Sequence, residues 1–155
     1  MYKRQVLPLV DAKVVDEELR DSPVTRHVSQ VAQMPAVREW VNSVVRSAAA
    51  ATDVVVDGRD IGTAVFPDAP LKVFLVADPW ERARRRLVQR LSRRPSNEEI
   101  AAETEALVLR DAQDATQSAP SRDAITIDTT TLTQEEQVER IVSLARATRT
   151  RLQGA

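Results

Sequence analysis

The tripeptide Gly58-Arg59-Asp60 follows a short apolar run, and its side chains are suited to binding a polar ligand. Glycine permits a turn at the end of the run, Arg59 offers a fork of N–H donors for phosphate, and Asp60 accepts hydrogen bonds from an amino group or a hydroxyl. Because ligands of open α/β sheets bind beyond the carboxyl ends of the strands, this position favours a binding site. A strand-terminal turn that carries a solvated ion pair explains the tripeptide equally well.

A run of arginines follows a second apolar segment, with seven arginines between Arg82 and Arg94. A basic helix face of this kind is often solvated, and it also suits nonspecific binding to nucleic acid through phosphates. Only 3% of the residues are aromatic, which disfavours a platform on which single-stranded bases stack. Because the run follows a predicted parallel strand, we favour a third interpretation, in which the arginines close over a polyphosphate.

A third group of charged residues, Arg110, Asp111 and Asp114, lies near the end of a predicted helix. Helical spacing places Arg110 and Asp114 on the same face. An ordinary surface ion pair of little energetic weight explains this arrangement, and its place beside the arginine run is the only local sign of a function. The only histidine, His27, lies on the apolar side of its predicted helix. The sequence therefore predicts a packing role for His27 and no catalytic histidine.

The composition is typical of one modest soluble globular domain. The chain has 155 residues, 43% of them hydrophobic, and a formal net charge of −1. It contains no cysteine, which excludes disulfide bonds and cysteine-based metal sites. No apolar run approaches the roughly 20 residues needed to span a bilayer, and the first residues lack the apolar stretch of a secretory signal. We therefore expect a cytoplasmic protein without membrane association.

Two helices are predicted in the first 50 residues. The first has Ser22 as its N-cap and Pro23 at its first helical position. The second begins at Pro35 and continues through "PAVREWVNSVVRSAAAA", in which apolar residues recur at helical spacing. The residues that keep the helical period are Val37, Trp40, Val41, Val44, Val45 and Ala48.

Strands alternate with helices after residue 50. The segments "DVVVDG", "LKVFLVA" and "AITIDTT" are short and apolar on both faces, which is typical of strands in a covered parallel sheet. Capping sequences predict helices that begin after Asp78, Ser96 and Thr133, the first two reaching about Leu91 and Asp114. The last helix is expected to turn four apolar residues inward, namely Val138, Ile141, Val142 and Ala145. The pattern indicates an α/β layered fold with crossover connections.

The stretch "DGRDIGTAVFPDAPLKVFLVADPWERARRR", followed by "RD" and "D" near residue 110 and by "IDTTTLTQEE", closely resembles bacterial cytidylate kinases. The upstream segment "VVDEELRDSPVTRHVSQVAQMPAVRE" resembles the insert of that family that covers the CMP base. The resemblance spans nearly the whole chain from about residue 10. It implies an α/β fold of the P-loop NTPase type, the nucleoside monophosphate kinase core, with a parallel sheet and flanking helices. Residues 1–50 would belong to the CMP-binding insert and residues 51–155 to the C-terminal part of the core.

The resemblance also implies an activity, in which a phosphoryl group passes from ATP to CMP or dCMP with Mg²⁺ as the cofactor. By matching motif, the cytosine-recognising residues would be Ser29, Arg38 and Asp60. Arg59 and Arg110 would bind phosphate, and Asp114 would contact the sugar. The expected partners are CMP, dCMP and ATP, with no membrane and no nucleic acid, and the complete protein is expected to be monomeric.

A lid over ATP is implied for residues of about 84–97, with three arginines as its phosphate contacts, Arg84, Arg85 and Arg86. The catalytic residues implied by the resemblance are Arg59, Arg85 and Arg110. Phosphoryl transfer needs little covalent help from the protein, so forks of arginine together with Mg²⁺ suit the reaction. An aspartate at position 60 would accept a hydrogen bond from the amino group of cytosine, which uracil lacks.

Two features depart from the family pattern. Gln117 stands where the family usually has another arginine. The 155 residues also contain no G-x-x-x-x-G-K-S/T segment, the loop that cradles the phosphates of ATP in P-loop kinases. We therefore expect the core without its P-loop strand and the following helix, as in an incomplete and inactive fragment from a clipped gene model. The alternatives are a shortened, non-catalytic homologue that binds a nucleotide or a protein partner, and an arginine-rich module that binds nucleic acid.

Overall fold

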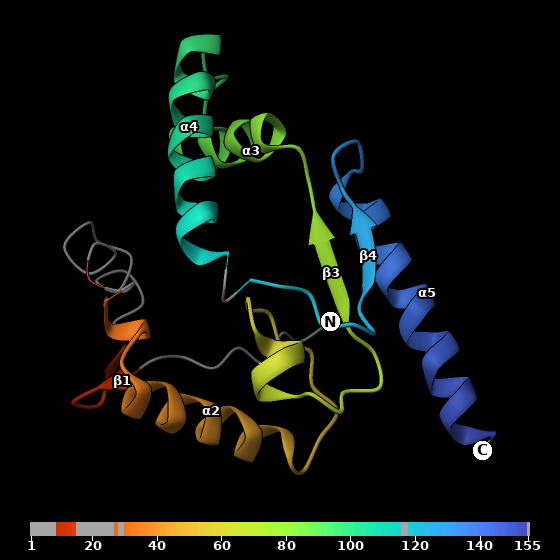
Figure 1. Cartoon of the computed structure of the whole chain (residues 1–155). Coiled ribbons are helices and arrows are strands. Elements are labelled where there is room, and N and C mark those ends of the chain that lie inside the picture. Colours follow the sequence, from red (N-terminus) through yellow and green to blue (C-terminus); the bar gives the residue numbers. More distant parts are fainter. Residues whose placement is uncertain (1–8, 15–26, 28–29, 116–117, 155) are drawn as a thin grey trace. The chain divides into compact units, whose positions relative to one another are not determined.

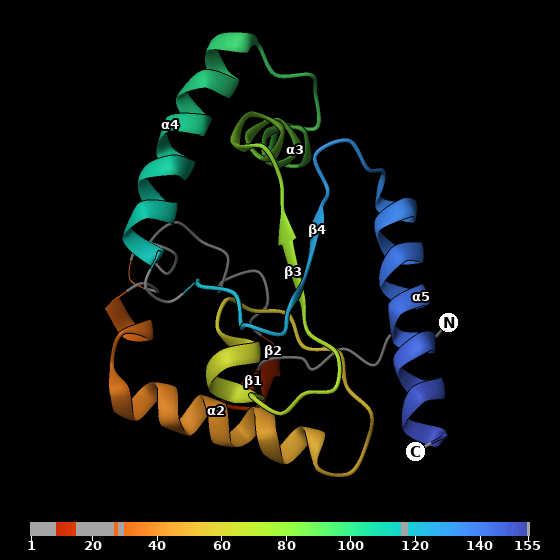
Figure 2. The same ribbon diagram turned by 45° about the vertical axis from the view of Figure 1, so that its right-hand side comes forward.

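The computed structural model describes residues 9–14, 27, 30–115 and 118–154. The chain divides into two compact units, Met1–Val54 and Val55–Ala155, and each is described by itself. Figures 1 and 2 show the elements of both units from two directions. Among the described residues, no helix combines the length and the apolar character needed to cross a bilayer.

The first unit contains a small hairpin and one long helix. Strands β1 (Leu9–Val10) and β2 (Lys13–Val14) pair in antiparallel fashion, with Leu9 opposite Val14. Asp11 and Ala12 both have positive φ angles, of 50° and 62°, as the tightest two-residue hairpin turns require. Helix α2 (Pro35–Ala49) begins with the predicted proline. Of the helix predicted from Pro23, His27 and residues 30–32 are helical, residue 33 lies in a turn, and the remaining positions lie outside the described residues. His27 is exposed, so its predicted packing role is wrong.

The second unit confirms the predicted α/β class. Strands β3 (Val73–Val76) and β4 (Ile125–Asp128) pair in parallel, with Val73 opposite Ile125. Two helices, α3 (Pro79–Leu91) and α4 (Asn97–Asp114), form the crossover between them, and α5 (Gln134–Gln153) follows β4. Figures 1 and 2 show α5 running beside β4 and α3 packed beside α4.

The buried core of the second unit lies mainly between α3 and α4. Its members are Ala83, Leu87, Ile100 and Leu107, with Leu91 partly buried against them. Ala83, Leu87 and Leu91 are four residues apart on α3, so they form one stripe along the helix. This stripe joins α3 and α4 into a helical hairpin whose polar faces carry the arginine run.

The three caps predicted for helices of the second unit are confirmed, whereas Ser22, the cap predicted in the first unit, lies outside the described residues. Asp78 Oδ1 accepts hydrogen bonds from the backbone N–H groups of Trp80 and Glu81, at 2.9 and 3.2 Å. Ser96 with Glu99, and Thr133 with Glu136, form capping boxes at the starts of α4 and α5. These caps depend on residues three positions apart, which explains why sequence alone located them.

The predicted strand in "DVVVDG" is wrong, because residues 53–57 carry no strand. Val55 is 99% exposed, and the only strand pairs among the described residues are β1 with β2 and β3 with β4. An apolar, β-branched segment becomes a strand only where a neighbouring chain accepts its hydrogen bonds. No described segment pairs with residues 53–57 in this way.

The periodic residues of α2 are mostly exposed, and the predicted inward face of α5 needs correction. On α2, Val37 and Val45 are half-buried, whereas Trp40, Val41, Val44 and Ala48 are exposed. On α5, Ile141 is half-buried as predicted, but Val138, Val142 and Ala145 are exposed, and the covered side instead carries Gln137, Leu144 and Thr148. Helical periodicity defines an apolar stripe, but the element that packs against it decides which side is covered.

Candidate phosphate-binding site

The Gly58-Arg59-Asp60 turn leads directly into a single π-helical turn, η2 (Ile61–Val65). The backbone carbonyl of Asp60 accepts hydrogen bonds from the N–H groups of Thr63 and Ala64, at 3.2 and 2.8 Å. Gly58 does not have a positive φ angle. A Cβ atom at Gly58 would instead lie 2.7 Å from Ile61 Cγ1. A side chain at position 58 would therefore require the Ile61 side chain or the turn to shift, although the backbone angle is an ordinary one.

Arg59 and Arg110, the two predicted phosphate-binding arginines of the second unit, act on the same carboxylate. Arg82 of α3 forms an ion pair with Asp111 of α4 through two hydrogen bonds, one of which joins Nη2 to Oδ1 at 3.2 Å. The Arg82 hydrogen bond lowers the pKa of Asp111, and the charges of Arg82, Arg59 and Arg110 lower it further. We call these four residues the Arg–Asp cluster.

The Arg–Asp cluster joins three segments of the second unit and carries an excess of positive charge. Arg59 comes from the turn before η2, Arg82 from α3, and Arg110 and Asp111 from α4. The side chains of Arg82 and Asp111 are 38% and 39% exposed, so solvent and ligands can reach the pair. Arginine forks are suited to binding phosphate oxygens, and the charges of three arginines act on this carboxylate.

The arginines predicted to contact ATP have protein partners in this conformation. Arg84 donates to both carboxylate oxygens of Glu81, at 2.8 and 2.7 Å, and these bonds are the main reason that the pKa of Glu81 is lowered. Arg86 Nε lies 3.1 Å from Glu103 Oε1 on α4. In each contact a carboxylate occupies the guanidinium group that a phosphate would bind. If these arginines bind phosphate as predicted, each must exchange its carboxylate partner for a phosphate group.

Arg85 differs from its neighbours because it contacts backbone as well as an acid. Its Nε donates to Glu81 at 3.0 Å, and its Nη2 donates to the carbonyl oxygens of Thr129 and Thr130, at 2.7 and 3.0 Å. These carbonyls follow β4 at the carboxyl end of the parallel pair. In this conformation Arg85 therefore stabilises the turn after β4, and its predicted phosphate contact stays a prediction.

Further ion pairs join the arginine run to acidic residues. Arg90 Nη2 lies 3.2 Å from Glu103, and Arg93 Nη2 lies 2.6 Å from Glu99 Oε1. Together with the pairs of Arg82, Arg84, Arg85 and Arg86, these contacts balance much of the positive charge of α3. A nucleic-acid surface depends on uncompensated positive charge, so this pairing disfavours that alternative.

The other predicted site residues are placed as follows. Ser29 and Gln117 lie outside the described residues. Arg38 lies in the first unit, on α2, where its Nη1 donates to the carbonyl of Ala32 at 3.5 Å. Asp60 is half-buried, and Asp114 is the last residue of α4. The charges of Arg59 and Arg110 both act on Asp111, and Arg38 lies in the other unit of the chain.

Sequence reasoning missed Arg82 and Asp111 as partners. Their side chains meet although 29 positions separate them in the chain, and no local spacing predicts a contact of that kind. The only signals were the place of Asp111 next to Arg110 and the place of Arg82 at the start of the arginine run.

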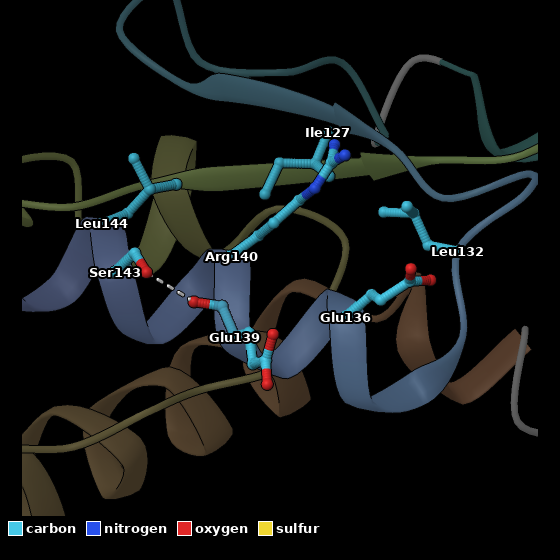
Figure 3. A pocket seen from close by; sticks show the side chains of 7 residues that line it. All are labelled: Ile127, Leu132, Glu136, Glu139, Arg140, Ser143 and Leu144. Atoms are coloured by element: carbon cyan, nitrogen blue, oxygen red, sulfur yellow. Dashed lines mark hydrogen bonds between the residues drawn. The ribbon is translucent and has the colours of Figure 1, made fainter.

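A hollow of about 590 Å³ lies between β4 and α5. Figure 3 shows the Arg140 side chain reaching from α5 toward Ile127 of β4. Two polar side chains here bond to nearby backbone, since Glu136 accepts from the backbone N–H of Thr133 and Ser143 Oγ donates to the carbonyl of Glu139. None of the predicted site residues lines this hollow.

Comparison with known proteins identifies the family. Residues 2–147 match the family described as cytidylate kinase, and the chain belongs to it. The chain is 41% identical to a cytidylate kinase of Limosilactobacillus fermentum, over 85% of this chain and 60% of that protein. It is 43% identical to one of Chloroherpeton thalassium, over 88% of this chain and 61% of that protein. It is 47% identical to a cytidylate kinase of Deinococcus deserti, over 81% of this chain and 57% of that protein. The chain thus spans about 60% of the length of these relatives.

Proposed function

We propose that this chain serves the transfer of the terminal phosphoryl group of ATP to CMP or dCMP, giving CDP or dCDP, and that the 155 residues alone do not turn CMP over, because they contain no G-x-x-x-x-G-K-S/T segment. The carrying observation is that the chain belongs to the cytidylate kinase family, and the charges of Arg59 and Arg110, which act on one carboxylate, support it. In phosphoryl transfer the protein mainly positions the reactants and stabilises charge, and arginine forks do both. The proposed role of Arg59 and Arg110 is to hold the phosphate of CMP.

Recognition of the base is assigned to Asp60, with Ser29 and Arg38, and recognition of the sugar to Asp114. The position of Asp60 directly after Arg59 supports this role. One turn then carries a hydrogen-bond donor for the phosphate and a hydrogen-bond acceptor for the base. An aspartate that accepts from the cytosine amino group would be left unpaired by uracil, and an unpaired buried acceptor costs about 1 to 3 kcal/mol. The proposed preference for CMP over UMP follows from that penalty.

The phosphates of ATP are assigned to Arg84, Arg85 and Arg86, within a lid of about residues 84–97. Arg84 and Arg86 are each paired with a carboxylate, and both side chains are 49% exposed. A triphosphate offers more acceptor oxygens than one carboxylate, so it can compete for these forks. In the proposed lid, Arg84 would therefore exchange Glu81, and Arg86 would exchange Glu103, for phosphate oxygens of ATP.

Magnesium is part of the proposal as the ion that accompanies ATP. The described residues contain no group of three or more His, Cys, Asp or Glu side chains that could hold a metal ion. No step of the proposed reaction is assigned to a protein-bound ion. Mg²⁺ is usually bound by one or two carboxylates together with substrate phosphates, so most of its ligands would come from ATP.

Nucleotide binding tests the proposed function directly. CMP and dCMP are expected to bind the chain more tightly than UMP in a calorimetric titration, and to bind more tightly than cytidine because the arginines hold the phosphate. Equal affinity for CMP and UMP would contradict the assignment of the base site. Equal affinity for CMP and cytidine would contradict the assignment of Arg59 and Arg110 to the phosphate.

A further inference from the structure

Lys72 carries a charged and almost completely buried side chain that the proposed reaction does not use. The side chain is 8% exposed, and the residue lies directly before β3. Burial of an ammonium group is costly unless hydrogen bonds and an opposite charge compensate it. Lys72 Nζ has both, since it donates to the two carboxylate oxygens of Asp123, at 3.0 and 2.8 Å, and to the carbonyl of Pro67. These contacts give the side chain a defined position.

The backbone of Lys72 is also held in place. Its carbonyl accepts a hydrogen bond, of 2.9 Å, from the N–H of Ile125, the first residue of β4. Asp123, the charge partner of Lys72, belongs to the turn before the same strand. Main chain and side chain of Lys72 are therefore both bound to the segment that begins β4. The lysine is a fixed point from which its side chain can hold another segment.

The segment that the Lys72 side chain contacts is η2, the yellow helical turn near the start of β3 in Figures 1 and 2. A Cβ atom at Gly62, the second residue of η2, would lie 3.2 and 3.5 Å from Lys72 Cδ and Cγ, so the lysine stem lies against the η2 backbone. Pro67, whose carbonyl accepts from Nζ, comes two residues after the end of η2. Lys72 therefore holds η2 near both of its ends.

The η2 turn in its turn holds the backbone of Asp60. The Asp60 carbonyl accepts hydrogen bonds from the N–H groups of Thr63 and Ala64, at 3.2 and 2.8 Å, and from the Thr63 hydroxyl at 3.2 Å. A shift of η2 would therefore shift Asp60 and the adjoining Arg59. The contacts of Lys72 thus lead, through η2, to the two residues assigned to the base and the phosphate.

We propose that Lys72 is a positioning residue for the candidate nucleotide site, and that it holds η2 so that Arg59 and Asp60 keep the arrangement that binds CMP. This inference rests on the proposed function, which assigns CMP to these two residues. Lys72 itself does not touch the nucleotide, and it acts through Gly62 and Pro67. A residue with this role changes the selectivity between bases, whereas a residue that only stabilises the fold changes the binding of all nucleotides alike.

Amide hydrogen exchange, followed by NMR on the whole chain without a ligand, tests the hold on η2. The reporters are the N–H groups of Thr63 and Ala64, and the reference is the N–H of Thr129, which donates to the Val76 carbonyl at 2.8 Å. We expect Lys72→Met to speed exchange at Thr63 and Ala64 by about tenfold, equivalent to one charge-assisted hydrogen bond, and to leave Thr129 unchanged. Equal acceleration at all three amides, or none at Thr63 and Ala64, would overturn the proposal.

A conservative variant and a charge-matched control accompany Lys72→Met. Lys72→Arg keeps a charged donor for the Pro67 carbonyl, and the larger guanidinium has room because Asp123 is 63% exposed. It should keep the wild-type exchange rates. Arg122→Met removes the same charge from an exposed position next to Asp123 and should also behave like the wild type.

Three outcomes of this series contradict the positioning role. Lys72→Arg could exchange as fast as Lys72→Met, or Arg122→Met could have the same effect as Lys72→Met. Circular dichroism could also show that Lys72→Met is unfolded, in which case the lysine serves the whole fold and not η2 in particular. Each of these results would overturn the proposal.

Titration of CMP and UMP into the same samples separates this inference from the proposed function. Lys72→Met should lower the preference for CMP over UMP by about tenfold. If the wild type binds CMP no better than UMP, the proposed substrate class is wrong, and the exchange rates alone decide whether Lys72 holds η2. If the wild type prefers CMP and Lys72→Met keeps that preference, the positioning role fails and the proposed function stands.

Discussion

Arg85 and Thr129 connect the arginine run to the end of the parallel strand pair. Arg85 Nη2 donates to the Thr129 carbonyl at 2.7 Å, across 44 positions of sequence. The same nitrogen also reaches the carbonyls of Thr130 and Leu132, at 3.0 and 3.4 Å. A guanidinium has five donors, so a single side chain can satisfy several carbonyls of a turn. One arginine therefore ties α3 to the segment between β4 and α5.

Replacement of Arg85 by methionine should destabilise the second unit. The variant keeps an unbranched stem but leaves the carbonyls of Thr129 and Thr130 without their charged donor, at a cost of about 2 kcal/mol. Arg90→Met is the matched control, because Arg90 is 57% exposed and pairs with an acid. Its expected cost is below about 1 kcal/mol. Urea denaturation followed by circular dichroism measures both, and equal losses would show that Arg85 does not stabilise this turn.

Stability is predicted to fall at acidic pH through Glu99. Arg93 donates to Glu99, and this contact together with the backbone N–H of Ser96 lowers the pKa of Glu99 from 4.5 to about 2. A carboxylate whose pKa is lowered by folding contributes stability above the unfolded pKa and loses it as the pH falls through the folded value. The contribution should therefore be present above about pH 4.5 and lost toward pH 2.

The variant Glu99→Gln checks this pH dependence. At pH 6 it should unfold at a lower temperature than the wild type, and the difference should shrink as the pH approaches 2. Glu105→Gln removes one exposed carboxylate further along α4 and serves as the control, with little change at either pH. A Glu99→Gln difference that does not depend on pH would show that the capping geometry, and not the charge, stabilises this end of α4.

Alanine at position 58 should be poorly tolerated. Its Cβ would lie 2.7 and 2.8 Å from Ile61 Cγ1 and Cδ1, so the Ile61 side chain or the turn must move. Overpacking of this kind costs about 1 to 3 kcal/mol. Gly154→Ala is the control, since its Cβ would be an ordinary 3.5 Å from the Thr150 carbonyl. Thermal unfolding of both variants tests the prediction, which fails if Gly58→Ala melts with the wild type.

Asp60→Asn should reduce the preference for cytosine. An amide at this position offers one carbonyl oxygen and an NH₂ group, so it can donate to the base as well as accept from it. The affinity for CMP is expected to fall by about 2 kcal/mol, and the affinity for UMP should change much less. Asp68→Asn, an equal change of charge at an exposed position, is the control. Titrations with both nucleotides measure the effect, and an unchanged ratio of affinities would remove Asp60 from the base site.

Local features of the chain were predictable because they depend on neighbouring residues. The caps at Asp78, Ser96 and Thr133 are formed by atoms two or three residues away, so sequence spacing defines them. The strands β3 and β4 were also predicted from short apolar runs, and their parallel pairing followed from the helices between them. The motif around Gly58 indicated the family, which the comparisons then confirmed.

Tertiary structure alone decided which of these local features meet. Residues 53–57 have the composition of a strand, but no described segment pairs with them. A strand forms only where a second segment accepts its backbone hydrogen bonds, and the composition of one segment does not reveal whether such a partner is present. The side of α5 that is covered, with Gln137 and Leu144, likewise depends on its place beside β4. The contact of Arg82 with Asp111 arises because the buried stripe of α3 fixes its rotation against α4. Sequence by itself determined the elements, the caps and the family, whereas packing between distant segments determined the pairing of charges.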